Sequence, residues 1–106
     1  MANIIVSGAG SSEVNGTYVV VDEAGGKPYY ENNANSDIGI GWGNGAWLIM
    51  NSSTFVIYYF SNDDVATPDL CTTWEVEDGE PPVPTVTKEV TGNPKHFLYY
   101  ARMRGN

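Results

Sequence analysis

Two tryptophans flank a glycine-rich turn in the stretch GIGWGNGAWLIM, residues 39–50. In residues 38–42, IGIGW, bulky side chains alternate with glycines, so a strand here has one bulky face and one bare face. Bare glycines predict that another part of the protein packs closely on that side. The triplet Gly43-Asn44-Gly45 suits a tight hairpin turn, and after it Trp47 and Ile49 share one face. This stretch therefore predicts an antiparallel hairpin.

The same pattern of short apolar runs, cut by turn residues about every eight to twelve positions, continues along the chain and is typical of an all-β sandwich or barrel. Connections this short join antiparallel neighbours, and no run predicts a helix. A length of 106 residues predicts one domain. We expect a small antiparallel sandwich or partly open barrel over residues 1–87, followed by a C-terminal extension, residues 88–106. The expected strands are residues 4–7, 17–22, 27–31, 38–42, 46–51, 55–60, 72–77, 85–90 and 97–103.

Two of these strands are apolar on both faces, which leaves the role of their aromatic rings open. A domain of this size builds much of its core from such rings, each of which buries roughly 150 to 250 Å². Core packing is the favoured interpretation of Trp42 and Trp47. The alternative is an exposed groove where rings stack on a sugar or on a partner chain. The candidate ligand-stacking residues are then Trp42, Trp47 and Tyr58, extended by Tyr29, Tyr30 and Tyr59.

Charge is distributed unevenly within the total of −8. Residues 1–87 hold one basic and twelve acidic residues, a net charge of −11, whereas residues 88–106 hold four basic residues and one acidic residue, a net charge of +3. A nucleic-acid partner is not expected, because contact with phosphates needs a basic surface. The basic end suits docking on an acidic neighbour or on the acidic part of the same chain.

The N-terminus, MANIIVSGAG, has neither a cationic leader nor an apolar run of signal-peptide length, and no segment is long enough to span a membrane. We expect synthesis in the cytoplasm, without a signal peptide and without a membrane partner. A single cysteine, Cys71, cannot form an internal disulfide. We interpret it as a buried strand thiol.

Catalytic and metal-binding signatures are weak. The only histidine, His96, has no Ser, Cys or Asp at a recognisable motif spacing, and the loop Gly8-Ala9-Gly10 lacks the third glycine of a dinucleotide fingerprint. Two acidic clusters offer oxygen ligands for Ca²⁺, but neither matches an EF-hand loop, so we interpret them as a solvated turn and an outward strand face. We predict a protein that is not an enzyme and has no cofactor and no metal. The clusters are residues 61–64 and the set Glu75, Glu77, Asp78 and Glu80.

The C-terminal extension combines apolar, β-prone and basic residues after a break at Gly92-Asn93-Pro94. It completes the domain's own sheet as an edge strand, or it pairs with a neighbouring subunit, where backbone hydrogen bonds supply affinity and side-chain pockets supply specificity. The candidate partner-binding residues are His96, Phe97, Tyr99, Tyr100, Arg102 and Arg104.

Eight short motifs occur in an order that resembles a small aromatic-rich β module. They are GAG (8–10), VNGTY (14–18), GKPYY (26–30), IGW (40–42), WLIM (47–50), YYFS (58–61), TWE (73–75) and GEPPVPTV (79–86). Modules of this kind are repeated in large multidomain proteins and stand alone in small bacteriophage structural proteins. The resemblance implies a β fold and brings no catalytic residues with it.

A single copy with an added tail looks most like a virion component. The resemblance thus implies a non-enzymatic capsid decoration protein located in the virion. It implies a protein that forms oligomers with copies of itself and contacts the major capsid protein or other virion subunits. The alternative function is a carbohydrate-binding module that attaches a tail or head fibre to a host glycan. Ring exposure distinguishes the two, since sugar binding needs rings that face solvent.

Overall fold

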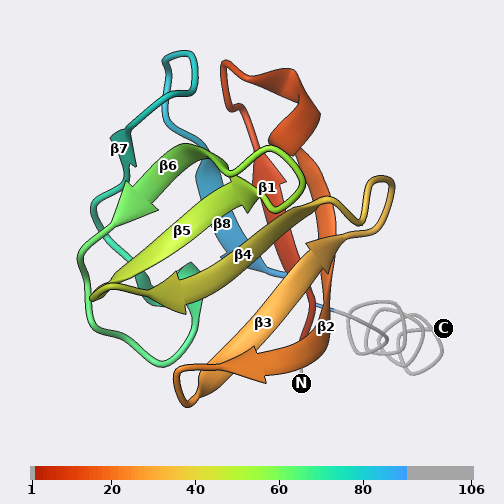
Figure 1. The fold of residues 1–106 in the computed structure, drawn as a ribbon, viewed down its shortest axis with the longest axis vertical. Helices are drawn as coiled ribbons and strands as arrows, with labels where there is room; N and C mark the ends of the chain where they lie inside the picture. Colours follow the sequence, from red (N-terminus) through yellow and green to blue (C-terminus); the bar gives the residue numbers. More distant parts are fainter. Residues whose placement is uncertain (1, 91–106) are drawn as a thin grey trace, which may run out of the picture.

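The computed structural model describes residues 2–90, which form an all-β domain (Figure 1). Eight strands make one antiparallel sheet in the order β7-β6-β5-β4-β3-β2-β1-β8. Two single-turn 3₁₀ helices, η1 (Ser12–Val14) and η2 (Pro68–Leu70), lie in the connections. The strands are β1 (Ile4–Ser7), β2 (Gly16–Ala24), β3 (Lys27–Asn32), β4 (Ile38–Gly43), β5 (Ala46–Asn51), β6 (Val56–Ser61), β7 (Glu75–Val76) and β8 (Thr85–Lys88).

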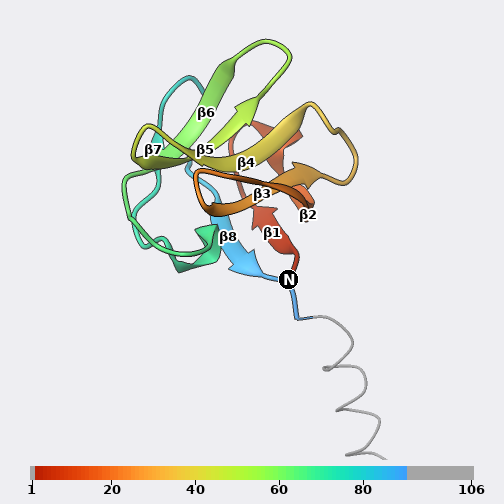
Figure 2. The same ribbon diagram turned by 60° about the horizontal axis from the view of Figure 1, so that its bottom comes forward.

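The sheet curls into a partly open barrel, so that β1 and β8 lie behind β4 and β5 (Figures 1 and 2). The all-β prediction is confirmed, and of the two expected architectures the partly open barrel is the one observed. Register shifts between Val20 and Asp22 in β2 and between Ile49 and Met50 in β5 mark bulges, which bend and twist a sheet. Neither 3₁₀ helix in residues 2–90 has the length and apolarity needed to cross a membrane.

The predicted tryptophan hairpin is the β4–β5 pair. Trp42 lies opposite Trp47 and Gly43 opposite Ala46, which leaves Asn44 and Gly45 as a two-residue loop. The φ angles of these two loop residues are 53° and 77°, as a hairpin turn with positive φ at both central positions requires. The turn chemistry read from the sequence therefore sets the register of the whole pair.

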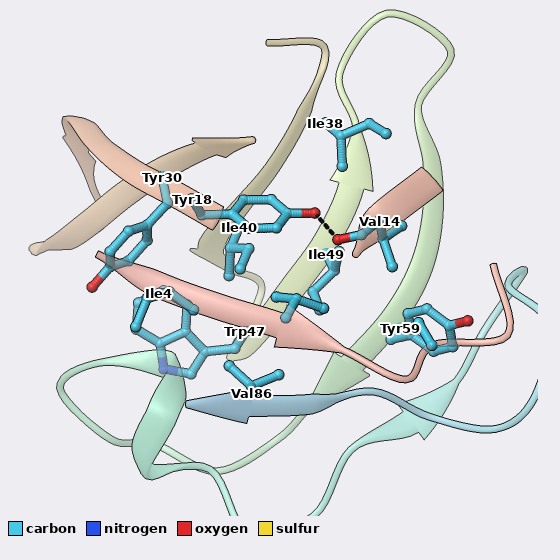
Figure 3. Close-up of a cluster of buried hydrophobic side chains, with 12 residues drawn as sticks. Ile4, Val14, Tyr18, Tyr30, Ile38, Ile40, Trp47, Ile49, Tyr59 and Val86 are labelled. Atoms are coloured by element: carbon cyan, nitrogen blue, oxygen red, sulfur yellow. Dashed lines mark hydrogen bonds between the residues drawn. The ribbon is translucent and has the colours of Figure 1, made fainter. Parts of the chain in front are cut away.

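The concave face of the sheet holds the core, and large rings fill much of it (Figure 3). Tyr18, Tyr30, Trp47 and Tyr59 are completely buried. The hydroxyl group of Tyr18 donates a hydrogen bond to the backbone carbonyl of Val14, so this ring ties β2 to η1. The aliphatic members of the core are Ile4, Val6, Ala9, Val14, Ile38, Ile40, Ile49 and Val86.

The bare face of β4 is covered closely, as its glycines predict. The ring of Tyr29, from the neighbouring β3, lies over Gly39 and Gly41 on the convex face. A Cβ atom at Gly41 would come within 2.7 Å of Cδ1 of Tyr29, and one at Gly39 would come within 2.8 Å of the carbonyl oxygen of Tyr30. Side chains at either position would collide with β3.

Strand predictions beyond β6 are partly wrong. Of residues 72–77 only Glu75 and Val76 are in a strand, because the carboxylate of Asp63 accepts hydrogen bonds from the backbone N–H groups of Thr72 and Thr73 and keeps them from the sheet. The strand expected over residues 85–90 ends at residue 88. The strand expected over residues 97–103 lies outside the described residues.

Phe55 was expected at the start of a strand, but it belongs to the turn before β6. Its φ is 61° and its side chain is 79% exposed. The side chain of Asn51 forms this turn by accepting hydrogen bonds from the backbone N–H groups of Ser53 and Thr54 at 2.9 and 3.1 Å. The Phe55 N–H then bonds to the Asn51 carbonyl at 2.7 Å.

Candidate functional site

Trp47 is a core residue, and its ring offers no face to a ligand. It is fully buried, its indole meets Trp42 edge to face with ring centroids 5.9 Å apart, and Nε1 donates a 3.0 Å hydrogen bond to the carbonyl of Val65. The hydrogen bond satisfies the only polar atom of the side chain, as burial of tryptophan requires. Between the two interpretations of Trp47, the structure shows core packing.

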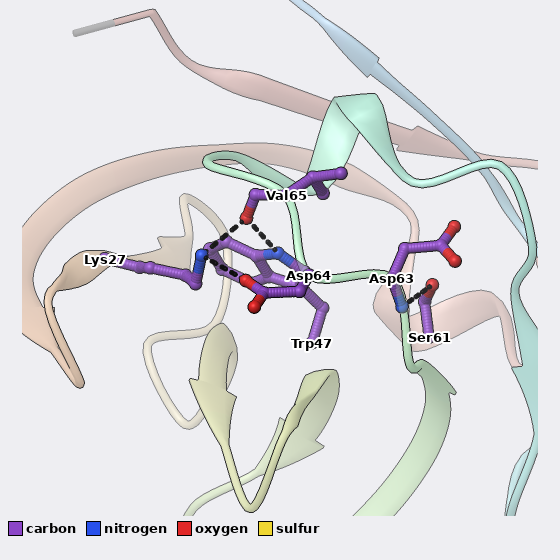
Figure 4. A network of polar contacts seen from close by, with 6 residues as sticks. All are labelled: Lys27, Trp47, Ser61, Asp63, Asp64 and Val65. Atoms are coloured by element: carbon purple, nitrogen blue, oxygen red, sulfur yellow. Dashed lines mark hydrogen bonds and ion pairs between the residues drawn. The ribbon is translucent and has the colours of Figure 1, made fainter.

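Trp42 is half-buried, and a lysine covers its ring. Nζ of Lys27 lies 4.6 Å from the ring centroid, an attractive cation–π geometry. The same ammonium group donates to the Val65 carbonyl at 2.9 Å and forms an ion pair with Asp64 at 3.0 Å (Figure 4). A sugar would have to displace Lys27 to stack on that face of Trp42. The sequence analysis did not anticipate this role of Lys27, which lies on a different strand.

Tyr58 is half-buried beside the core, and its environment is negative. Its ring is 6.5 Å from that of Tyr59 with an interplanar angle of 30°, and burial followed by the nearby charge of Glu13 raises the pKa of its hydroxyl group. Within residues 2–90 the close ring pairs are Tyr30 with Trp47, Trp42 with Trp47 and Tyr58 with Tyr59. Each of these pairs contains a fully buried ring, so none of them forms an exposed stacking platform.

The hydroxyl group of Tyr59 joins three parts of the chain at one buried point. It accepts a 2.9 Å hydrogen bond from the backbone N–H of Ser11 and donates one of 2.6 Å to the carbonyl of Glu80. Glu80 in turn donates its N–H to the hydroxyl oxygen of Ser11 at 2.9 Å. Tyr59 is therefore a structural tie between β6, the loop after β1 and the loop before β8.

The carboxylates of the first acidic cluster, residues 61–64, make hydrogen bonds and an ion pair within the domain. Asp63 accepts hydrogen bonds from the backbone N–H and hydroxyl group of Thr72 and from the N–H of Thr73, and these bonds lower the pKa of its carboxyl group. Asp64 pairs with Lys27. The acidic residues of the second cluster are exposed. Within residues 2–90 no group of three His, Cys, Asp or Glu residues is arranged to hold a metal ion.

The convex face of the sheet carries an apolar groove. Its volume is about 220 Å³, and it lies over β5 and β6 near the β4–β5 turn. Leu48 and Phe60 are paired across the two strands and line it together with Ile57. One acidic side chain, Glu77, completes the lining. In the sequence, the sign of this surface was that two of the expected strands are apolar on both faces.

Cys71 is not in a strand, contrary to the expectation. It follows η2, where its N–H donates to the carbonyl of Pro68 at 3.2 Å, and its side chain is half-buried against the core. Burial raises the pKa of its thiol group, which opposes formation of the reactive thiolate.

The six candidate partner-binding residues of the C-terminal extension, His96, Phe97, Tyr99, Tyr100, Arg102 and Arg104, lie outside the described residues, so their role stays a prediction.

No family model, curated protein or solved structure matches the chain. The resemblance to bacteriophage and repeat-protein modules therefore stays a prediction made from the sequence.

Proposed function

We propose that the chain is a non-enzymatic structural protein of a bacteriophage virion, a capsid decoration protein that stabilises the head through subunit contacts. The observation that carries the proposal is the apolar groove on the convex face. The concave face holds the core, and the half-buried side chains of Leu48, Ile57 and Phe60 on the opposite face line the groove within residues 2–90, where a partner can contact them. Contiguous apolar surface of this kind is typical of protein interfaces.

Charge supports the same function. Residues 2–90 contain two basic and thirteen acidic residues, whereas residues 91–106 contain three basic residues and no acidic residue. Opposite charges on the two parts favour contacts in which the tail of one subunit meets the acidic surface of another and speed their encounter. The motif order described above adds the expectation that the partners are the major capsid protein and further copies of this chain.

Carbohydrate binding has less support from the ring geometry. Trp42 and Tyr58 keep some exposure, but Lys27 covers Trp42 and the close ring pairs all include a buried member. A glycan array separates the two functions. Binding of a defined glycan that is lost on substitution of Trp42→Ala would favour host attachment over decoration.

Mass spectrometry of purified particles from the native source tests the main proposal. The chain should be present in a fixed ratio to the major capsid protein, and particles stripped of it should lose resistance to heat. Particles that lack the chain, or that hold it in a variable trace amount, would overturn the proposal.

A further inference from the structure

The convex groove is one part of a wider apolar stripe that crosses four strands. Residues directly opposite each other in antiparallel strands point to the same face, so the strand register traces this stripe across the sheet. Leu48 is opposite Phe60 and Met50 is opposite Ile57, while the ring of Tyr29 covers the neighbouring glycines of β4. All five of these side chains are half-buried. The apolar stripe therefore runs from β3 to β6 and comprises Tyr29, Leu48, Met50, Ile57 and Phe60.

Carboxylates border the apolar stripe on both sides. On the side of β7, Glu75 is directly opposite Phe60, and Glu77 lines the groove. On the side of β3, Glu31 is in line with Met50, because both are opposite the same glycine of β4. Four strand spacings separate β3 from β7, so the two acidic borders are about 19 Å apart along the sheet.

The basic residues of the described chain leave these borders negative. Residues 2–90 contain two of them, Lys27 and Lys88. Lys27 is paired with Asp64, and Lys88 ends β8, which lies behind β4 and β5 in Figure 1. The charge of Glu31 reaches the stripe, since it adds to burial in raising the pKa of the Tyr29 hydroxyl group. An occupant of the stripe therefore meets negative charge on both sides.

This combination of apolar surface and charge narrows the class of partner. Nucleic acids and anionic lipid surfaces are negative, so the acidic borders repel them. A second copy docked through the same face would set acidic borders against acidic borders, because a two-fold contact brings the same patch of both subunits together. A protein segment with an apolar centre and basic residues on both sides is complementary to the stripe and to its borders.

We infer that the apolar stripe binds a segment of another protein in which apolar side chains lie between basic residues, with the basic residues facing Glu31 on one side and Glu75 and Glu77 on the other. Burial of the apolar centre supplies affinity. The two borders supply selectivity and speed the encounter. The inference rests on the proposed function and deepens it, because it names the chemistry of the virion surface that the chain contacts.

Synthetic peptides added to the isolated full chain test this inference. The probe has leucine and phenylalanine at its centre and lysines at both ends. One control peptide keeps the apolar centre between glutamates, and the other keeps the lysines around a centre of serine and glycine. Fluorescence anisotropy should show that the probe binds at least tenfold more tightly than either control, and that its binding weakens as salt is added. Amide NMR signals of Leu48, Ile57 and Phe60 should shift with the probe.

Charge variants at the two borders supply a test of sign. Glu31→Gln and Glu77→Gln should each weaken binding of the probe about two- to fivefold, as loss of an exposed charge contact implies. Glu31→Lys combined with Glu77→Lys should reverse the preference, so that the peptide with glutamate ends binds more tightly. Glu89→Gln is the matched control. It removes the same charge beyond β8 and keeps an oxygen for the hydrogen bond from Asn3, so it should bind the probe as the native chain does.

Equal binding of the peptides with lysine and glutamate ends would overturn the inference, as would an unchanged preference in the double lysine variant. Binding of the probe that appears only after truncation following Pro94 would overturn it too, because part of the chain itself would then occupy the stripe. Self-association of the native chain that is lost in Leu48→Gln would assign the stripe to a second copy and have the same consequence.

The peptide measurements and the mass spectrometry of particles fail separately. A chain that is found in virions in a fixed ratio but does not prefer the probe keeps the proposed function and loses this inference. A chain that prefers the probe but is absent from virions keeps the stripe's preference for apolar and basic segments and loses the virion as the place where the stripe is used.

Discussion

Tyr29 lies across Gly41 so closely that a Cβ atom on this glycine would sit 2.7 Å from Cδ1 of the ring. The pair joins β3 to β4 on the convex face. An aromatic side chain over a strand glycine covers backbone that would otherwise be bare and fixes the register of the two strands. The glycines of β4 are therefore needed for the close approach of a neighbour.

Substitutions along β4 should follow this geometry. Gly39→Ala should cost the most stability, because its Cβ meets both Tyr29 and the backbone carbonyl of Tyr30, and Gly41→Ala should cost about 1 to 3 kcal/mol, as overpacking does. Gly43→Ala is the control on the same face, since its Cβ would meet only Cδ1 of Leu48 at an ordinary 3.9 Å. Urea unfolding measures all three. Equal losses at the three positions would show that collision with Tyr29 and Tyr30 does not set the cost, since chain entropy alone favours Ala over Gly.

Tyr59→Phe should destabilise the fold without disturbing its shape. The substitution leaves the N–H of Ser11 and the carbonyl of Glu80 without their buried partner, at a cost of about 1 to 3 kcal/mol. Tyr58→Phe is a matched control, because that hydroxyl group is on a half-buried side chain where water can replace lost partners. Thermal melting of the two variants should separate them clearly, and a larger loss for Tyr58→Phe would contradict the bridging role of Tyr59.

Local signals account for what the sequence predicted well. Alternation of bulky residues and glycines identified both faces of β4, and the Asn44-Gly45 loop followed from turn chemistry. The even spacing of apolar runs was enough to identify an all-β fold. Each of these depends on residues close together in the chain, so the sequence displays them directly.

Contacts between distant segments account for what the sequence analysis missed. Asp63 removes Thr72 and Thr73 from their expected strand through hydrogen bonds across nine and ten positions. Lys27 covers Trp42 only because β3 lies beside β4. No periodicity or motif encodes such contacts. The sequence likewise left open whether the aromatic rings belong to the core or bind a ligand. The structure answers this for Trp47, which the curled sheet buries completely.

Alkaline pH should destabilise the protein through Tyr18. Burial raises the pKa of its hydroxyl group from 10.0 to about 12 in the folded state. Between these values the unfolded chain loses the proton while the folded chain keeps it, so the free energy of unfolding falls as pH rises. The loss is about 1.4 kcal/mol per pH unit over this window, and none of it is present below pH of about 9. Urea titrations followed by tryptophan fluorescence should show a shallower fall for Tyr18→Phe. An identical pH profile in this variant would assign the loss to other groups.

The convex groove should be required for assembly and dispensable for folding. Leu48→Gln places an amide among the apolar side chains of the groove and should abolish binding to stripped particles, with only a modest fall in melting temperature. Val21→Gln is the control, because Val21 is 48% exposed at the bulge of β2 and does not line the groove. Cosedimentation with stripped particles measures both. Retained binding by Leu48→Gln would exclude the groove as the contact surface.

Truncation after Pro94 should separate folding from assembly. The described sheet ends in β8, which pairs with β1 from Thr85 to Lys88, so the truncation removes none of its eight strands. We therefore expect the melting temperature to stay within a few degrees of the native value, while assembly measured by sedimentation is lost with the partner-binding residues. If residues 97–103 were instead a strand of the domain's own sheet, the truncation would remove several buried side chains, each contributing roughly 1.5 to 3 kcal/mol, against a total stability of about 5 to 15 kcal/mol. A steep fall in melting temperature with unchanged assembly would show that the extension acts within its own subunit.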